Sequence, residues 1–246
     1  MNFSAALFER LKAASAVCVL TGAGISAESG VPTFRGPEGL WSKFRPEELA
    51  SFDAFIRNPR LVWEWYTYRK KVMQEVQPND AHRALVVLQD LFADFTLVTQ
   101  NVDNLHQRAG SRKVLELHGN LERSYCIDCR RPASNVTLGD GVDVPRCSSC
   151  GGLLRPDVVW FGEVLPQRTF MEAQWSAEHS DVFLTIGTSG IVYPAAWLPL
   201  GAREAGSYVV EINTEYTDLS PNMSETIIGK AAAVLPELVR LLQHKN

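Results

Sequence analysis

Four short stretches of the chain are apolar at nearly every position instead of alternating between apolar and polar residues. A strand buried on both faces of a parallel sheet has this pattern, because helices cover each face. Helical patterns lie between the stretches, at Ala81–Phe92 and Pro194–Ala205. Strands alternating with helices predict an α/β fold with a doubly wound parallel sheet, in which ligands bind at the carboxyl ends of the strands. The expected strands are Ala16–Leu20, Phe95–Thr99, Val182–Ile186 and Tyr208–Ile212.

Two segments interrupt this alternation of strands and helices, and we interpret them as insertions into the sheet domain. Residues 34–78 are rich in aromatic and basic side chains and lack a good strand, so we expect a loop followed by helices. Residues 123–155 hold paired cysteines around a connection that contains Gly and Asp. The parallel sheet is then expected to form from the remaining chain, which comprises residues 1–33, 79–122 and 156–246.

The paired cysteines have the spacing of a zinc site. Cys126 and Cys129 form one C-x-x-C pair, and Cys147 and Cys150 form a second one after the intervening residues 130–146. Such pairs let four thiolates converge on one zinc ion in tetrahedral geometry, and a shell closed by four thiolates leaves no position for a catalytic water. We therefore predict one structural zinc ion, against the alternatives of a redox dithiol and of four unrelated buried cysteines.

Composition and charge narrow the class of protein. The 246 residues carry 24 basic and 28 acidic side chains, a formal net charge of −4, which gives no electrostatic reason to bind nucleic acid or an anionic membrane. No apolar run reaches the roughly 20 residues that span a bilayer, and residues 1–14 resemble an amphipathic helix more than a signal peptide. We expect a cytoplasmic protein, because cysteines in that reducing compartment bind metal in preference to forming disulfides.

Small and polar residues cluster where the expected strands end. The first strand runs into a glycine-rich turn that can approach a phosphate, but its spacing is not that of a dinucleotide fingerprint, and a simple strand-to-helix turn fits it equally well. Each other group taken singly fits a solvated loop, whereas all of them together favour a nucleotide cleft. The groups are Gly22, Ala23, Gly24 and Ile25; Gln100, Asn101, Val102 and Asp103; Gly187, Thr188 and Ser189; and Asn213, Thr214 and Glu215.

His118 follows a short apolar stretch between the expected cleft and the expected zinc module. A lone histidine in such a position is more often structural than catalytic. An imidazole titrates near neutral pH, however, and therefore suits a general base that acts on a sugar hydroxyl. The residues alone leave both interpretations open.

The combination of these motifs resembles the sirtuin family of NAD-dependent protein-lysine deacylases. The resemblance implies a Rossmann-like sheet domain with a smaller zinc-binding plus helical domain inserted, and NAD and acyl-lysine meeting between the two. The chain departs from the family pattern at Thr33, where many members have Asp, and at Val102, where Ile is commoner. The matching blocks are Gly22–Ser26, Gly30–Pro32 with Phe34 and Arg35, Thr99–Asp103, His118 with Gly119, the four cysteines, Val159–Glu163 and Gly187–Ser189.

The resemblance also implies a reaction and the residues that carry it out. The amide oxygen of acyl-lysine attacks C1′ of the nicotinamide ribose as nicotinamide leaves, and His118 then draws a proton from the ribose hydroxyls. The 2′ oxygen attacks the imidate carbon, and water completes the transfer to give lysine and O-acyl-ADP-ribose. The substrate backbone would pair as an added strand with Val159, Trp160, Phe161 and Gly162, followed by Glu163. The implied NAD contacts are Gly22, Ala23, Gly24, Ile25, Glu28, Thr33, Phe34, Arg35, Trp41, Gln100, Asn101, Val102, Asp103, Gly187, Thr188, Ser189, Asn213, Thr214, Glu215 and Ala231.

Tyr66 and Arg69 lie three residues apart on one face of the expected helix Pro59–Met73. A guanidinium fork matches a carboxylate in bidentate fashion, and the phenol adds a further donor. Packing of the phenol and a solvated basic run are the alternative interpretation. The Tyr-x-x-Arg pattern, together with residues 27–35, resembles the class III sirtuins, in which the pair reads the carboxylate of succinyl- or malonyl-lysine. This resemblance implies removal of succinyl and malonyl groups and, more weakly, of acetyl groups.

Other functions remain as alternatives. A plain deacetylase or a mono-ADP-ribosyltransferase would use the same fold and NAD. A Rossmann oxidoreductase would need an acidic residue about twenty positions after the glycine turn, where the aromatic insertion lies instead. A zinc-ribbon binding protein without catalysis would release no nicotinamide. The expected partners are acyl-lysine proteins or peptides, with no direct nucleic acid and no membrane, and a monomer is compatible with the sequence.

Overall fold

The computed structural model describes residues 3–33, 45–134, 136–139 and 143–243. Within them, a six-stranded sheet forms the larger lobe, and each neighbouring pair of its strands is parallel. The predicted strands correspond to β1, β2, β7 and β8, so the doubly wound α/β prediction is confirmed. The order is β3 (Val114–Glu116), β2 (Asp94–Thr99), β1 (Ala16–Thr21), β7 (Val182–Ile186), β8 (Tyr208–Asn213) and β9 (Glu225–Ile228).

The edge strands β3 and β9 were not predicted. β3 has three residues and β9 has four, and each pairs with a neighbour on one side of the sheet. An edge strand of this length carries no long apolar run, because less of it is enclosed by neighbouring elements. The sequence signal that identifies central strands is therefore absent from both.

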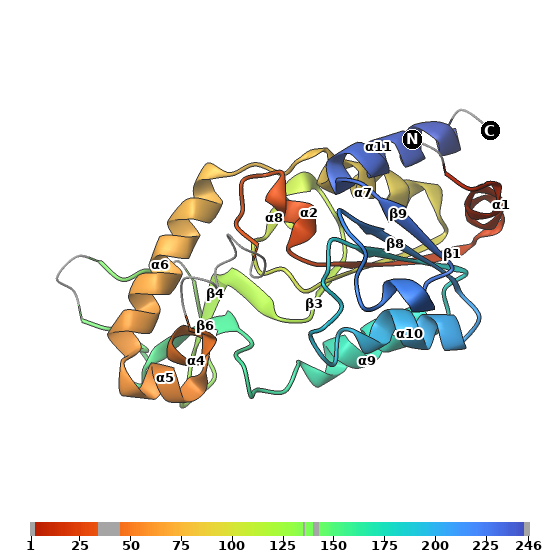
Figure 1. The fold of residues 1–246 in the computed structure, drawn as a ribbon. Helices are drawn as coiled ribbons and strands as arrows, with labels where there is room; N and C mark the ends of the chain where they lie inside the picture. The colour runs from red at the N-terminus through yellow and green to blue at the C-terminus, as the bar shows by residue number, and fades with distance from the viewer. Residues whose placement is uncertain (1–2, 34–44, 135, 140–142, 244–246) are drawn as a thin grey trace.

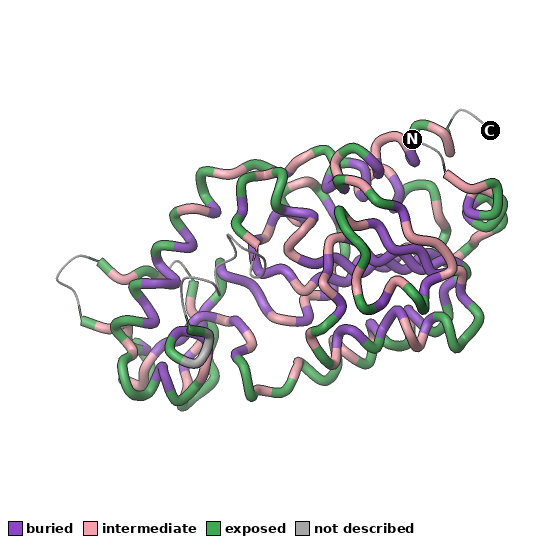
Figure 2. Tube along the Cα trace, viewed as in Figure 1, coloured by how far each residue is buried: buried purple, intermediate pink, exposed green. Residues whose placement is uncertain are grey.

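Helices cover both faces of the sheet (Figure 1). α7 (Asp80–Leu91) packs with α11 (Ala231–Gln243) on one face, and α9 (Gln167–Glu178) packs with α10 (Trp197–Glu204) on the other. Figure 2 shows that the buried part of this lobe is concentrated in the strands between these layers. The sheet is thus enclosed from both sides, as its continuous apolar strands require.

Two helices begin later along the chain than the sequence predicts. α10 begins at Trp197 instead of Pro194, because the preceding residues form tight turns in which the amides of Ala196 and Trp197 donate to the carbonyl oxygens of Val192 and Pro194. The amino-terminal helix, α1, is confined to Ala5–Ala13, where the Ser4 hydroxyl accepts from the amide of Leu7 as an N-cap.

The order of the strands reverses next to β1. The chain leaves β1 for β2 and β3 on one side and later reaches β7, β8 and β9 on the other. The carboxyl ends of these strands point toward the smaller lobe (Figure 1). In a sheet of this kind the crevice at such a switch point is where ligands bind.

The smaller lobe combines helices with an antiparallel sheet. Helices occupy the described part of the aromatic insertion, as predicted, and the small sheet extends from Gly119 to Val158, which is beyond residues 123–155 at both ends. How the chain divides into domains stays a prediction. The elements are α4 (Pro46–Leu49), α5 (Phe52–Arg57), α6 (Pro59–Glu75) and the sheet of β5 (Pro132–Ser134), β4 (Gly119–Cys126) and β6 (Leu154–Val158).

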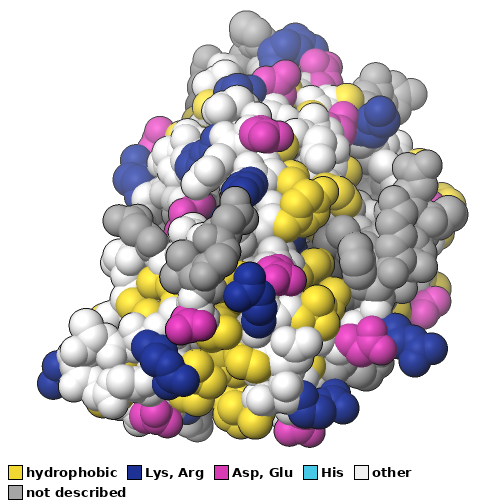
Figure 3. Space-filling view, turned by 90° about the vertical axis from the view of Figure 1, so that its left-hand side faces the viewer, with side chains coloured by type: hydrophobic (Ala, Val, Ile, Leu, Met, Phe, Trp, Pro, Cys, Tyr) yellow, Lys and Arg dark blue, Asp and Glu magenta, His cyan; other side chains and the backbone are white. Residues whose placement is uncertain are grey.

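A separate hydrophobic core holds the smaller lobe together. Trp63 of α6 is fully buried in it, and its indole N–H donates to the carbonyl oxygen of Leu154 in β6 across 2.8 Å. This contact joins the helices to the small sheet. At the surface of this end of the molecule, hydrophobic side chains lie among charged ones (Figure 3), and Phe52, Ile56 and Leu61 of α5 and α6 are among the exposed hydrophobic residues of the chain.

Candidate functional site

The glycine-rich turn after β1 is in close contact with the end of β7. A Cβ atom on Gly22 would lie 2.7 Å from the carbonyl oxygen of Gly187, and one on Gly24 would lie 2.7 Å from the Cα atom of Gly187. Both positions therefore need glycine, because a side chain would push the two strand ends apart. The amides of Gly22 and Gly24 donate to the carbonyl oxygens of Ile186 and Gly187, which fixes the turn against the strand.

The polar loop after β2 is bound to this turn. Gln100 donates from Nε2 to the hydroxyl of Thr188 across 2.9 Å, and Asn101 donates from Nδ2 to the carbonyl oxygen of Gly22 across 3.1 Å. The hydroxyl of Ser26 donates to Asp103 across 2.7 Å. Burial raises the pKa of Asp103, while its hydrogen bonds and nearby arginines oppose the rise. The structure therefore brings together residues that were predicted to contact NAD and that directly follow β1, β2 and β7.

The remaining predicted NAD contacts differ in their surroundings. Asn213 donates from Nδ2 to the carbonyl oxygen of Thr188 across 2.9 Å. Glu28 accepts from the amide of Ala232, next to Ala231 at the start of α11. Ala23, Thr33 and Ser189 are half-buried, and Ile25 and Val102 are buried. Thr214 and Glu215 are exposed. Three further predicted contacts, Phe34, Arg35 and Trp41, lie outside the described residues.

His118 stands between β3 and β4 with its ring fixed by the loop after β2. Its Nδ1 atom donates to the carbonyl oxygen of Gln100 across 2.9 Å, since a carbonyl can only accept. In the neutral ring the Nε2 atom is then the acceptor. Burial lowers the pKa of His118 below its usual 6.5, and the bond to Gln100 opposes the shift. The imidazole is therefore held as a neutral base near pH 7.

Four sulfur atoms converge in the smaller lobe. The Sγ atoms of Cys126, Cys129, Cys147 and Cys150 all lie within 4.8 Å of one another, with separations of 3.5 Å for Cys126–Cys150 and 3.7 Å for Cys129–Cys147. Zn–S bonds of about 2.3 Å in a tetrahedron place sulfurs about 3.8 Å apart. The cluster therefore fits one zinc ion with a closed shell of thiolates.

The backbone around each cysteine pair folds back on itself. The amide of Arg130 donates to the carbonyl oxygen of Cys126, and the amide of Gly151 donates to that of Cys147. Both Arg130 and Gly151 have positive φ, of 62° and 77°. Each pair thus forms a tight turn that presents its two sulfurs to the same point, which explains why the C-x-x-C spacing is needed.

Comparison with known proteins assigns the chain to a family. The family model described as Sir2 matches residues 22–194. The chain belongs to the Sir2 family, the sirtuins. A protein of Aquifex aeolicus named NAD-dependent protein deacylase is 48% identical over 229 residues, which cover 93% of this chain and 96% of the relative. A Pyrobaculum aerophilum protein named NAD-dependent protein deacylase 2 is 52% identical over 238 residues, covering 96% and 94%.

Solved sirtuin structures share the same fold. A complex of a Sir2 homologue mutant with ADP-ribose superposes with a TM-score of 0.95 at 43% identity, covering 98% of this chain and 97% of that one. A complex of Sir2 with a p53 peptide and NAD+ gives a TM-score of 0.88 at 32% identity, covering 99% and 100%. These likenesses confirm the predicted Rossmann-like α/β fold of this sirtuin, and the four-cysteine cluster fits the predicted zinc site.

The segment after β6 approaches both the small helices and His118. The amide of Val159 donates to the carbonyl oxygen of His118, and the amide of Phe161 donates to that of Ala50. Phe161 is about half exposed, whereas the carboxylate of Glu163 turns inward to the guanidinium of Arg155 and the amide of Trp160. Glu163 therefore holds this segment of the sirtuin from within.

Tyr66 and Arg69 lie side by side on α6, as their spacing predicts. The guanidinium carbon of Arg69 lies 4.9 Å from the ring centre of Trp65 and 5.9 Å from that of Tyr66. Both side chains are buried, which raises the pKa of Tyr66 to about 12 and lowers the pKa of Arg69. Asp103 partly offsets the effect on Arg69, so the negative charge of this carboxylate, in the loop after β2, acts on the guanidinium.

A buried polar chain beneath the sirtuin site was not predicted. The imidazole of His106 donates from Nε2 to the Thr21 hydroxyl across 2.9 Å, and Thr21 donates to the Thr99 hydroxyl across 2.8 Å, which also accepts from the amide of Asn101. Thr21 and Thr99 are the last residues of β1 and β2. A hydroxyl at the end of an otherwise apolar strand was the available signal.

In the part of the chain that the structure describes, no helix has the length and apolar character needed to cross a membrane.

Proposed function

We propose that His118 is the general base of this sirtuin, an NAD-dependent protein deacylase. The observation that carries the proposal is the hydrogen bond from Nδ1 of His118 to the carbonyl oxygen of Gln100. It selects the tautomer whose Nε2 atom accepts a proton, at the carboxyl edge of a sheet where nucleotides bind. The names of the relatives, which are NAD-dependent protein deacylases, support the same activity.

NAD is a substrate of this reaction and supplies the ribose that accepts the acyl group. Its pyrophosphate is proposed to lie against the turn at Gly22 and Gly24, which close contact with Gly187 fixes at the carboxyl ends of the strands. Gln100, Asn101 and Asp103 would orient the nicotinamide half, since they are already held by neighbouring residues. The adenosine half would lie along Thr188, Ser189, Asn213, Thr214, Glu215 and Ala231.

His118 would remove a proton from a ribose hydroxyl after nicotinamide has left. Its pKa is lowered by burial, so the ring is neutral and able to accept a proton at the pH of the cell. General-base catalysis of this kind contributes about 10²–10⁴-fold. The hydrogen bond to the carbonyl of Gln100 keeps a proton on Nδ1, so the accepted proton goes to Nε2. The same bond prevents rotation of the ring.

The acyl-lysine peptide is proposed to bind beside residues 159–162. The amide of Phe161 is already bonded to Ala50, so the segment is held in place from one side and can pair with an extended peptide from the other. Main-chain pairing gives affinity without a strict sequence requirement. Glu163, which follows these residues, supports the segment through Arg155 and remains a proposed contact of the peptide.

The proposed acyl group carries a carboxylate, as in succinyl- and malonyl-lysine. Tyr66 and Arg69 are buried next to each other. The negative charge of Asp103, in the loop after β2, favours the charged form of Arg69. A guanidinium in a dry site binds a carboxylate more strongly than one in water. A plain deacetylase would need no such buried cation near its acyl group.

One set of rate measurements tests this proposal. The kcat/KM values are measured on a single peptide that carries acetyl-, malonyl- or succinyl-lysine, with NAD present. We expect turnover of all three, with malonyl and succinyl preferred over acetyl. A preference for acetyl would remove the acidic-acyl assignment while leaving the deacylase, and no turnover of any peptide would contradict both.

A further inference from the structure

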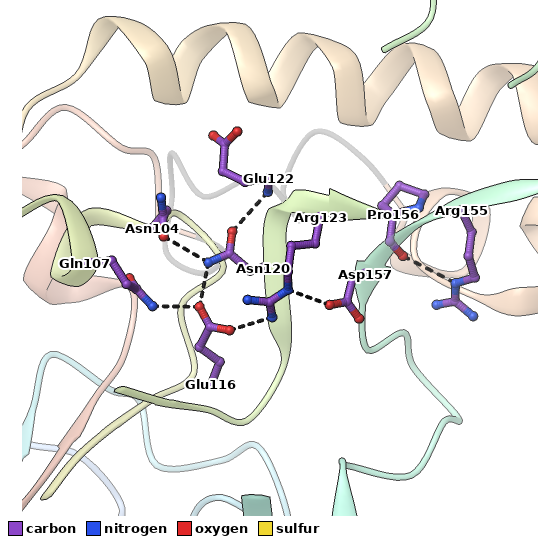
Figure 4. Close-up of polar contacts among 9 residues, drawn as sticks. All are labelled: Asn104, Gln107, Glu116, Asn120, Glu122, Arg123, Arg155, Pro156 and Asp157. Carbon is purple, nitrogen blue, oxygen red and sulfur yellow. Dashed lines mark hydrogen bonds and ion pairs between the residues drawn. The ribbon is translucent and has the colours of Figure 1, made fainter. Parts of the chain in front are cut away.

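Glu116 accepts hydrogen bonds from several elements at once. It is the last residue of β3, and its side chain is 12% exposed. One carboxylate oxygen accepts from Nε2 of Gln107 across 2.6 Å and from Nδ2 of Asn120 across 2.5 Å. The other pairs with Nη2 of Arg123 across 2.5 Å. Figure 4 shows these side chains converging on Glu116 from α8 (Leu105–Ala109) and β4.

His118 lies at the centre of a five-residue segment whose two ends are joined by a hydrogen bond to this carboxylate. The bond between Glu116 and Asn120 spans residues 116–120, with His118 two positions from either end. Gly119 has a φ of +80°, and a Cβ atom there would lie 2.0 Å from the carbonyl oxygen of Asp157. The backbone on both sides of His118 is therefore tightly constrained.

The same carboxylate connects the two lobes. Through Asn120 it reaches Asn104, which directly follows Asp103 and has a φ of 64°. Through Arg123 it reaches Asp157 of β6, whose carboxylate accepts from Nε of Arg123 across 2.8 Å. The loop of the NAD side and the sheet of the zinc side are thus joined at Glu116.

All the partners named for Glu116 are donors, so a carboxylate suits this position and an amide does not. Glutamine has the same shape, but its NH₂ group would face Arg123 or the amides of Gln107 and Asn120. Hydrogen bonds to a charged acceptor are also about twice as strong as neutral ones. The charge of Glu116 therefore determines how firmly the segment is held.

We propose that Glu116 is a positioning residue that fixes the backbone of residues 117–119, and with it the imidazole of His118, relative to both lobes. The inference rests on the proposed deacylase reaction, in which nicotinamide leaves before His118 accepts a proton. Displacing His118 therefore slows the second half of the reaction and spares the first. Small displacements of a catalytic group are enough for this, since about 1 Å can cost 10²-fold in rate.

The test compares two rates in Glu116→Gln. Product formation is followed by mass spectrometry, and the first half is followed by exchange of labelled nicotinamide into NAD with acyl peptide present. We expect kcat for product formation to fall about tenfold to a hundredfold, with KM for the peptide and the exchange rate within about threefold of wild type. Equal loss of both rates, or loss of neither, would overturn the positioning role. Absence of exchange in the wild-type enzyme would instead contradict the proposed function.

A second variant and a control complete the test. Arg123→Gln removes the half-exposed link to Asp157 and should give the same selective loss to a smaller degree, even if Glu116→Gln does not fold. Glu172→Gln breaks the exposed ion pair with Lys113 at the opposite end of β3 and should leave both rates unchanged, since such pairs contribute under about 1 kcal/mol. Unchanged product formation in Arg123→Gln would contradict the link between the lobes.

Discussion

Trp160 donates its indole N–H to the phenolic oxygen of Tyr66 across 2.8 Å, in the interior of the smaller lobe. The bond joins α6 to the segment that is proposed to bind the peptide. Because an indole can only donate, Tyr66 must accept, and its own phenolic hydrogen is then directed elsewhere. Tyr66 thus supports the segment after β6, and we propose that it also donates to the acyl group.

Replacing Tyr66 with Phe should affect both stability and acyl preference. The N–H of Trp160 would lose its acceptor in a buried site, which costs about 1–3 kcal/mol. Urea unfolding measures this loss, and kcat/KM for succinyl-lysine should fall more than kcat/KM for acetyl-lysine. Tyr68→Phe is the matched control, because Tyr68 is 62% exposed and should change neither quantity. Unaltered stability of Tyr66→Phe would contradict the bond.

Replacing Arg69 with Met should separate acidic from neutral acyl groups. Charge-assisted hydrogen bonds contribute roughly 1.5–3 kcal/mol each, so desuccinylation should fall tenfold to a hundredfold or more. Deacetylation makes no use of that charge and should fall little or rise. Arg60→Met on the same helix, where Arg60 pairs with Glu64 at the surface, should leave both rates unchanged. An equal decrease of both activities in Arg69→Met would show that the guanidinium does not read a carboxylate.

The rate should tolerate mild acid. The base is active when neutral, which is the state above its pKa, and burial places the pKa of His118 below 6.5. The kcat/KM profile of the wild-type enzyme should therefore fall toward acid with its midpoint below pH 6.5. An acid limb with its midpoint above 6.5 would mean that the group which titrates is not this buried imidazole.

Zinc removal should abolish activity by loss of structure. The four sulfurs form a closed cluster in the smaller lobe, and no substrate atom can bind a metal whose coordination shell is full. Chelation, or Cys147→Ser, should lower the thermal midpoint and deacylation together. Zinc added to the intact enzyme should not raise kcat. An increase of kcat with added zinc would assign the metal a catalytic role that the closed shell excludes.

Much of the fold was predictable because the central strands and the motifs are local features of the sequence. β1, β2, β7 and β8 are buried on both faces, so their composition alone identifies them. The cysteine pairs work in the same way, since each C-x-x-C turn forms within a few residues. The glycines at 22 and 24 were recognisable as a turn, although their reason for being glycine lies at Gly187, far along the chain.

What escaped prediction depends on contacts between distant residues. Glu116 has no role that its place before His118 in the sequence indicates, because its partners come from α8 and β4. Glu163 stays a predicted peptide contact, but the ion pair that turns its carboxylate toward Arg155 was not predicted. β3 and β9 are short edge strands whose pairing is set by the rest of the sheet. No spacing within the sequence specifies these relationships.

The most direct test of the account is the product analysis of wild-type enzyme and His118→Tyr, each incubated with NAD and a succinyl-lysine peptide. For the wild type we expect equal amounts of free-lysine peptide, nicotinamide and O-succinyl-ADP-ribose, as measured by liquid chromatography with mass spectrometry. For His118→Tyr we expect loss of product with an unchanged unfolding midpoint. An ADP-ribosylated peptide that keeps its acyl group, or near-normal deacylation by the variant, would contradict the assignment of His118 as the base of an NAD-dependent deacylase.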